Sequence, residues 1–172
     1  MRNEQANTPS SVAVSSTERR LPSGATTSAR GGLIQKRIEF RIPGKVIGKG
    51  RPHFVKKTGV AITPQLTRGY ESLIRDVALP LMGGQSPWEG CVRVDITAKY
   101  KIPKSWSKKD RQLAIEGKVP PKKPDVDNVV KIVLDALNRV VYLDDTQVTQ
   151  CTVRKMWDED EDSLAVYMEE LE

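Results

Sequence analysis

Cysteine is scarce in this sequence, and the little that is present does not form a metal-binding pattern. The chain of 172 residues contains two cysteines, Cys91 and Cys151, which lie far apart and each within an apolar run. Zinc sites need closely spaced Cys and His ligands, so this spacing gives no zinc centre. Isolated thiols of this kind predict buried side chains in a reducing compartment.

Long apolar runs are also missing. No stretch approaches the roughly 18 consecutive apolar residues of a membrane span. The N-terminus lacks the apolar core of a secretory signal peptide. We therefore expect a cytoplasmic protein with no membrane association.

Residues 1–33 have no apolar periodicity and are rich in Ser, Thr, Gly, Asn and Arg. Such a segment cannot bury enough apolar surface to offset the entropy of ordering it. We therefore predict a disordered arm over residues 1–34 and one folded domain over residues 35–172, a length that suits a single core.

Basic residues are absent from the C-terminal segment. Eight of the 22 acidic residues lie between Asp158 and Glu172, where there is no Lys or Arg. The net charge of +6 therefore hides a body, residues 1–157, with 28 basic and 14 acidic residues. Such a body is typical of proteins that bind nucleic acid, although many basic domains bind nothing. We expect the acidic tail to lie away from any surface that binds nucleic acid, or to meet basic residues of a second copy.

The apolar pattern predicts strands interleaved with helices. Strands are predicted over residues 36–42, 91–101, 148–157 and 164–168, a hairpin over 53–62 turning at Thr58-Gly59, and helices over 64–81, 108–116 and 126–138. This order predicts a small single α+β domain whose mixed sheet packs against two main helices.

The predicted helix over residues 126–138 is apolar on most of its sides. Its polar residues form one narrow seam at steps of three and four: Asn128, Lys131, Asp135 and Asn138. A helix of this kind is buried on most sides, and its polar seam must be satisfied inside the fold or line a cleft. The apolar surplus also suggests this helix as the place where two copies pair.

Carboxylates flank this helix. Asp125 and Asp127 lie at its start, where acids cap free N–H groups and meet the positive end of the helix dipole. The chain then returns through a short apolar run to Asp144 and Asp145. Folding this run back beside the helix brings Asp145, and less certainly Asp144, to the first pair, with Lys131 one turn beyond Asp127.

A set of carboxylates predicts a hard metal ion. Carboxylate oxygens suit Mg²⁺ or Mn²⁺, and Mg²⁺ keeps waters that can attack a phosphodiester. Each feature alone has an ordinary explanation, because an Asp before a helix is usually a cap and an Asp-Asp pair is usually a solvated turn. The segment from Asp125 is not an EF-hand calcium loop. Such a loop needs a Gly at its sixth position and a Glu at its end, whereas the sixth position here is Val130 and no Glu closes the loop.

Taken together, residues 124–148 resemble the signature of the RusA family of junction resolvases. The matching residues are Asp125, Asp127, Asn128, Lys131, Asp135-Ala136-Leu137 and Asp144-Asp145-Thr146-Gln147-Val148. Two flanking segments also resemble the family pattern, G-K-G-R-P over residues 48–52 and T-P-x-x-T-x-x-Y over residues 63–70.

The resemblance implies a RusA-like fold and a Mg²⁺-dependent endonuclease, with Mn²⁺ expected to substitute. Such an enzyme resolves Holliday junctions by paired symmetric nicks, as a homodimer, in DNA recombination and repair. By the same resemblance Asp125, Asp127 and Asp145 are the catalytic metal ligands and Lys131 is the catalytic lysine. Asp144 is a less certain ligand. We interpret Asp135 as structural, capping or pairing with a base.

Basic residues around these motifs are the predicted DNA contacts. They are Lys49, Arg51, Lys56, Lys57, Arg68, Lys122 and Lys123. His53 either contacts a phosphate or is an ordinary loop residue, which we favour. Trp106 either stacks on an unpaired base or packs against the protein, which we favour, whereas Trp88 and Trp157 are predicted core residues.

Two other functions compete with a nuclease. A non-catalytic junction-DNA-binding protein would use the same basic surface, but it gains nothing from a carboxylate cluster that faces phosphate. A metal-dependent phosphoesterase acting on small nucleotides would need a closed phosphate loop, and the Gly44–Gly50 segment is too short and lacks a Ser or Thr after its Lys.

Overall fold

The computed structural model describes residues 36–51, 53–54 and 61–172. Its strands are β1 (Arg37–Pro43), β2 (His53–Phe54), β3 (Ala61–Ile62), β4 (Val92–Lys101), β5 (Val148–Asp158) and β6 (Ser163–Glu170). Its helices are α1 (Gln65–Ala78), α2 (Lys108–Ile115) and α3 (Val126–Leu137), with 3₁₀ turns η1 (Leu79–Met82) and η2 (Asp145–Gln147). The predicted arm and the turn at Thr58-Gly59 lie outside the described residues, whereas the pairing of β2 with β3 is present.

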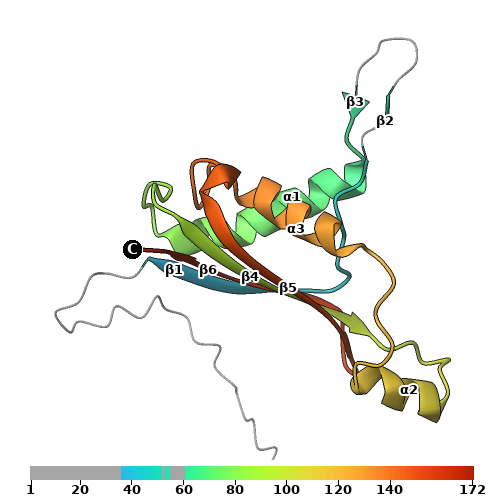
Figure 1. Ribbon diagram of the computed structural model, residues 1–172. Coiled ribbons are helices and arrows are strands. Elements are labelled where there is room, and N and C mark those ends of the chain that lie inside the picture. The colour runs from blue at the N-terminus through green and yellow to red at the C-terminus, as the bar shows by residue number, and fades with distance from the viewer. Residues whose placement is uncertain (1–35, 52, 55–60) are drawn as a thin grey trace, which may run out of the picture.

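Four strands form a mixed sheet in the order β1-β6-β4-β5. β6 is antiparallel to both of its neighbours, and β5 runs parallel to β4. Parallel neighbours need a crossover connection, which here contains α2 and α3. α1 and α3 cover one face of the sheet, and α2 lies beyond its far end (Figure 1). The predicted small α+β domain is confirmed. Within the described segments, no helix has the length and apolar character needed to cross a membrane.

Buried and partly exposed residues alternate along β4, so one face of this strand packs against the helices. Alternate residues face the helices and are buried: Val92, Val94, Ile96, Ala98 and Tyr100. The residues between them are partly exposed on the opposite face, as a period of two requires.

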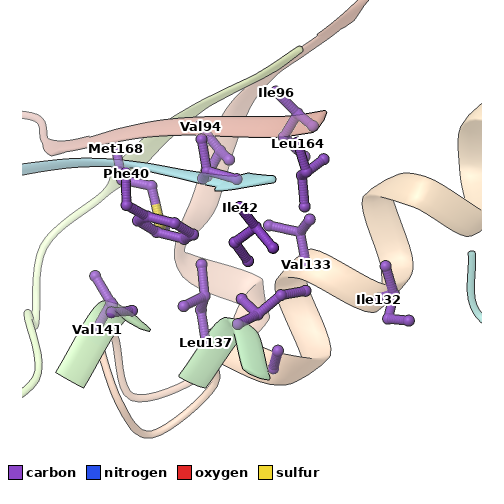
Figure 2. Packing of buried hydrophobic residues seen from close by; sticks show 14 of the residues in the cluster. Phe40, Ile42, Val94, Ile96, Ile132, Val133, Leu137, Val141, Leu164 and Met168 are labelled. Carbon is purple, nitrogen blue, oxygen red and sulfur yellow. The ribbon is translucent and has the colours of Figure 1, made fainter. Parts of the chain in front are cut away.

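α3 packs against both the sheet and α1. Its fully buried residues are Val129, Ile132, Val133, Ala136 and Leu137. Figure 2 shows Val133 and Leu137 meeting the sheet residues Phe40, Ile42 and Leu164. Each fully buried aliphatic side chain of this size stabilises the fold by about 1.5–3 kcal/mol. Most of the apolar surface of α3 is therefore covered within this chain, but Val126 at its start is 45% exposed, so the pairing of two copies at this helix stays a prediction.

The cysteines differ from the sequence prediction. Cys91 and Cys151 are both exposed thiols and not buried ones. Cys91 precedes β4 in the register that faces away from the helices, and Cys151 lies in the edge strand β5, which has no strand beyond it. Trp88 is buried as predicted, and Trp157 is partly buried at the edge of the core.

The acidic C-terminal segment meets basic residues of its own chain. The ion pairs are Lys99–Asp158, Arg111–Glu159, Arg41–Glu161, Arg93–Glu169 and Lys36–Glu170. Exposed pairs of this kind contribute little to stability individually. They nevertheless show that the segment can satisfy its charge without a second copy.

Asp158 is the best-connected acid of this segment and gives a test of the fold. The Lys99 ammonium, 2.9 Å away, and the backbone amides of Asp160 and Glu161 hold the pKa of Asp158 at about 2. Because this folded-state pKa is depressed, its stabilisation is present above the unfolded pKa near 3.8 and is lost as pH falls through about 2. Asp158→Asn should therefore lower the free energy of unfolding at neutral pH by about 1–2 kcal/mol.

Urea denaturation of both proteins at neutral and at acidic pH checks this prediction. The difference between wild type and Asp158→Asn should shrink towards zero near pH 2. An equal difference at both pH values would contradict it.

Candidate active site

The first pair of carboxylates lies where the chain enters α3. Asp125 is the N-cap residue, and its carbonyl accepts a hydrogen bond from the Val129 amide. Its carboxylate makes no capping hydrogen bond, so the prediction that this side chain caps the helix is wrong. Asp125 and Asp127 are exposed, and within the part of the chain that the structure describes neither carboxylate has a hydrogen-bond or ion-pair partner. Both are available to bind a cation.

The glycine-rich segment before β2 packs directly against the start of α3. A Cβ atom on Gly48 would lie 2.6 Å from Cβ of Pro124 and 3.1 Å from Cβ of Asn128, so a side chain does not fit there. The Lys49 amide also donates a hydrogen bond to the Asn128 carbonyl, at 2.8 Å. This close approach fixes the backbone that presents Asp125.

Gly50 makes the matching contact with the start of α1. A Cβ atom there would lie 2.8 Å from Oγ1 of Thr67 and 3.0 Å from Cγ of Pro64. The Gly50 amide donates to the buried Thr67 hydroxyl at 3.2 Å. The two flanking segments that resemble the family pattern therefore interlock, and in this part they hold α1 and α3 together.

Lys49 forms an ion pair with Asp135 on the polar seam of α3. Its ammonium lies 2.6 Å from the Asp135 carboxylate and 2.5 Å from the Glu71 carboxylate of α1. Burial lowers the pKa of Lys49, but hydrogen bonds and charge from Asp135 and Glu71 outweigh burial and raise it. The interpretation of Asp135 as the partner of a base is confirmed, and the ammonium of Lys49 lies in a partly buried ion pair between two helices.

The motif after α3 is built around Gln147. Its side-chain oxygen accepts hydrogen bonds from the amides of Leu143 and Asp144 at 2.8 and 2.9 Å. Its side-chain amide donates to the carbonyls of Trp88 and Gly90 at 3.0 and 2.9 Å. This glutamine ties the turn to the segment that leads into β4, which is a structural role.

The two adjacent aspartates of the motif have different environments. Asp144 caps the turn η2, because its carboxylate accepts a hydrogen bond from the Thr146 amide at 3.0 Å. A hydrogen bond with the Thr146 side chain lowers the pKa of Asp144, and a smaller effect of the same sign comes from the Thr146 backbone. Asp145 is exposed, and its carboxylate does not cap the turn. Asp145 is therefore the freer of the two carboxylates.

Asp145 lies near the C-terminal end of α3, whereas the first carboxylate pair lies at its N-terminal end. Tyr142 donates its hydroxyl to the Leu134 carbonyl in the last turn of α3, at 2.7 Å. Burial raises the pKa of Tyr142, and the nearby carboxylates of Asp145 and Asp135 raise it further. The 12 residues of α3 rise about 18 Å. Within one chain the predicted gathering of the acids is not seen: no three Asp, Glu, His or Cys side chains of the described residues form a group that could hold a metal ion.

The predicted basic residues are mostly available at the surface. Lys131 is exposed on the polar seam, one turn beyond Asp127, and forms no ion pair within the described segments. The exposed members of the predicted DNA-contact set are Arg51, Arg68, Lys122 and Lys123. Lys56 and Lys57 lie outside the described residues, and the role of His53, the first residue of β2, stays a prediction.

Sequence reasoning missed Glu71, the second partner of Lys49. Thr67 and Glu71 are four residues apart in α1, so they share one helical face. A polar pair on a face that also carries buried residues signals partners on another element. That Lys49 is the partner of Glu71 follows only from the packing of α1 beside α3, which could not be predicted from the sequence.

Comparisons with known proteins agree with this motif pattern. The family described as "Endodeoxyribonuclease RusA" matches residues 43–169. The chain is also similar to the "Uncharacterized protein YqaN" of Bacillus subtilis (strain 168). The two are 33% identical over 131 residues, which cover 72% of this chain and 89% of the relative.

Lys49 provides a test of this arrangement. Lys49→Ala should lower the free energy of unfolding by about 1–3 kcal/mol, because it leaves Asp135 and Glu71 without the cation that they share. Chemical denaturation measures the change. Lys123→Ala, which removes an exposed lysine, is the matched control and should change stability by less than about 0.5 kcal/mol. Unchanged stability in Lys49→Ala would show that the pair does not hold the two helices.

Proposed function

The chain belongs to the RusA family of endodeoxyribonucleases, and from this premise we propose that it resolves Holliday junctions by Mg²⁺-assisted paired nicks. Family membership supports a junction-resolving endonuclease in general and branched DNA as its substrate. The choice of Mg²⁺, with Mn²⁺ able to substitute, and the symmetry of the two cuts belong to the proposal. The process served is DNA recombination and repair.

One observation carries the proposal: two aspartates of the motif make contacts that stabilise the fold, whereas the other three do not. Asp125, Asp127 and Asp145 are exposed, and in the described residues none of their carboxylates caps a helix or joins an ion pair. By contrast, Asp135 pairs with Lys49, and Asp144 caps a turn. Carboxylates that contribute nothing to the fold are free for chemistry.

These three side chains fit a hard divalent ion. Their oxygens are the ligands that Mg²⁺ prefers in proteins. When bound, Mg²⁺ supplies charge that stabilises the reacting phosphate and lowers the pKa of a bound water. Lys131 is proposed to neutralise charge on the phosphate or its leaving oxygen, because its exposed ammonium lies one turn from Asp127.

The exposed basic residues are proposed to hold the DNA backbone beside this acidic site. Lys122 and Lys123 lead directly into Asp125, and Arg51 and Arg68 lie exposed near the start of α1. The positive charge of these residues offsets the repulsion between the carboxylates and the DNA phosphates.

The separation of the acids along α3 favours a site shared between two chains. Asp145 lies near one end of α3 and the first pair at the other, and an exposed apolar residue accompanies each half: Leu143 (50% exposed) and Val126 (45% exposed). A two-fold homodimer can bring Asp145 of one copy to the first pair of the other, and it gives the two equivalent sites that paired nicks require.

A non-catalytic junction binder remains the alternative. It would use the same basic surface, but it gives no reason for three free carboxylates beside that surface. Substitution of these acids separates the two functions.

Asp125→Asn, Asp127→Asn and Asp145→Asn should each lower junction cleavage at least ~100-fold, the scale for loss of a group that stabilises developing charge. Each removes a negative charge that faces DNA, so junction binding should stay equal or strengthen. Cleavage of a labelled junction and a gel-shift titration measure the two effects.

The matched control is Asp144→Asn, which lies beside Asp145 and keeps an oxygen that can accept the Thr146 hydrogen bond. It should retain most of the cleavage activity. Near-normal cleavage by any of the first three variants would remove that residue from the site, and normal cleavage by all three would leave only DNA binding.

A mixture of two inactive proteins tests the shared site. In a heterodimer of Asp127→Asn and Asp145→Asn chains, one of two shared sites contains only native aspartates and the other contains both substitutions. Mixing should therefore restore nicking of one strand of the junction. If each chain carried its own complete site, mixing would restore nothing. Light scattering on the wild type should report about twice the chain mass of 19.2 kDa.

A further inference from the structure

A hollow of about 510 Å³ lies at the far end of the sheet, where β4 and β5 end beside α2. Three aromatic residues line it: Tyr100 at the end of β4, Trp106 before α2 and Trp157 near the end of β5. α2 stands off the sheet here, and the chain that follows it runs up to the start of α3 (Figure 1). The volume falls within the range of about 300–1,000 Å³ that small-molecule sites occupy.

The walls of this hollow are held in place. The Trp157 indole N–H donates to the Val119 carbonyl at 2.7 Å, and the Lys155 ammonium donates to the Pro121 carbonyl at 2.9 Å. The Trp106 ring meets the Trp157 ring edge to face, with centroids 4.9 Å apart. The segment after α2 is therefore fixed against β5, and the aromatic surface keeps its shape.

Tyr100 contributes an aromatic ring to this wall. The residue is only 8% exposed, and its hydroxyl is buried with no hydrogen-bond partner in the described part of the chain. Because the hydroxyl is closed off from solvent, the hollow meets the ring of Tyr100 and not its polar group.

The charge around the hollow suits an anion next to a ring. Lys122 and Lys123 line it and are exposed. Two acids, Asp110 and Asp162, also line it, but their carboxylates accept hydrogen bonds, from the Ser107 hydroxyl at 2.7 Å and from the Lys101 amide at 2.7 Å. Lys101 lines the hollow as well, so three lysines and two aspartates give the lining a net charge of +1, which favours a phosphate.

The hollow leads to the candidate active site. A second hollow of about 320 Å³ shares Tyr100 and Lys123 with the first and extends to Gly48 and Pro124. The next residue along the chain is Asp125, the first of the free carboxylates. A strand cut at these carboxylates would therefore pass the mouth of the aromatic hollow within a few nucleotides.

We propose that this hollow receives one unstacked base of the DNA strand being cut, with its phosphates held by Lys122 and Lys123. The proposal deepens the proposed function and rests on it, because it takes branched DNA as the substrate. Trp106 supplies a face for stacking, and Tyr100 adds apolar ring surface to the wall. Bases at a branch point are the least costly to unstack, because their pairing is already disturbed.

A thermodynamic cycle between Trp106 and the DNA tests this site. Four-way junctions with one abasic nucleotide, placed in turn at each position around the cut, are bound to full-length protein in EDTA and titrated by gel shift. With the wild type, removal of one base should weaken binding about 5- to 150-fold, the effect of one stacked base. With Trp106→Ala, removal of the same base should change the affinity less than about twofold.

Ile115→Ala is the matched control, because Ile115 is an exposed residue of α2 that does not line the hollow. It should keep the full wild-type loss at that position. Trp106→Leu keeps apolar packing but offers no aromatic face, so it carries the same cycle if Trp106→Ala fails to fold. The absence of any base whose removal couples to Trp106 would overturn the proposal.

Cleavage of the intact junction in Mg²⁺ is recorded in parallel, so that the two proposals fail separately. Cleavage without coupling at any base would overturn the base site and leave the nuclease. Coupling at one base without cleavage would support the base site and overturn the proposed catalysis.

Discussion

The burial of α3 is the constraint on which the rest of the structure depends. This helix is apolar on all sides but one, so it must pack against both the sheet and α1. At one position of its polar seam, the Lys49 ammonium joins Asp135 to Glu71 of α1. With the helix held by the sheet, by α1 and by Lys49, its position is fixed, and a carboxylate lies exposed near each end.

The motif residues divide between those that support the fold and the acids that are proposed to carry the chemistry. Gly48 and Gly50 allow close backbone contact with α3 and α1, and Gln147 ties the turn after α3 to the lead-in of β4. The remaining acids at the two ends of α3 have no part in this support. The division follows from sterics and hydrogen bonds, and it shows why a single sequence motif contains both kinds of residue.

Much of the fold followed from local pattern, because periods of two and of three to four residues directly report which face is buried. β4 and α3 were predictable in this way, and so was the pairing of Asp135 with a base. The exposure of Cys151 was not, because it depends on β5 being an edge strand. The separation of Asp145 from the first carboxylate pair was not predictable either, because it depends on how the chain returns along α3. Glu71 needed the contact between α1 and α3.

The central claim is that this chain is a metal-dependent enzyme that cuts branched DNA at paired positions. The most direct measurement uses a four-way junction labelled in turn on each strand, incubated with the full-length protein with and without Mg²⁺ and read at nucleotide resolution. The account predicts two nicks at symmetry-related positions near the crossover, formed only with the metal ion and absent from linear duplex of the same sequence. Metal-independent cutting, or equal cutting of the linear duplex, would contradict it.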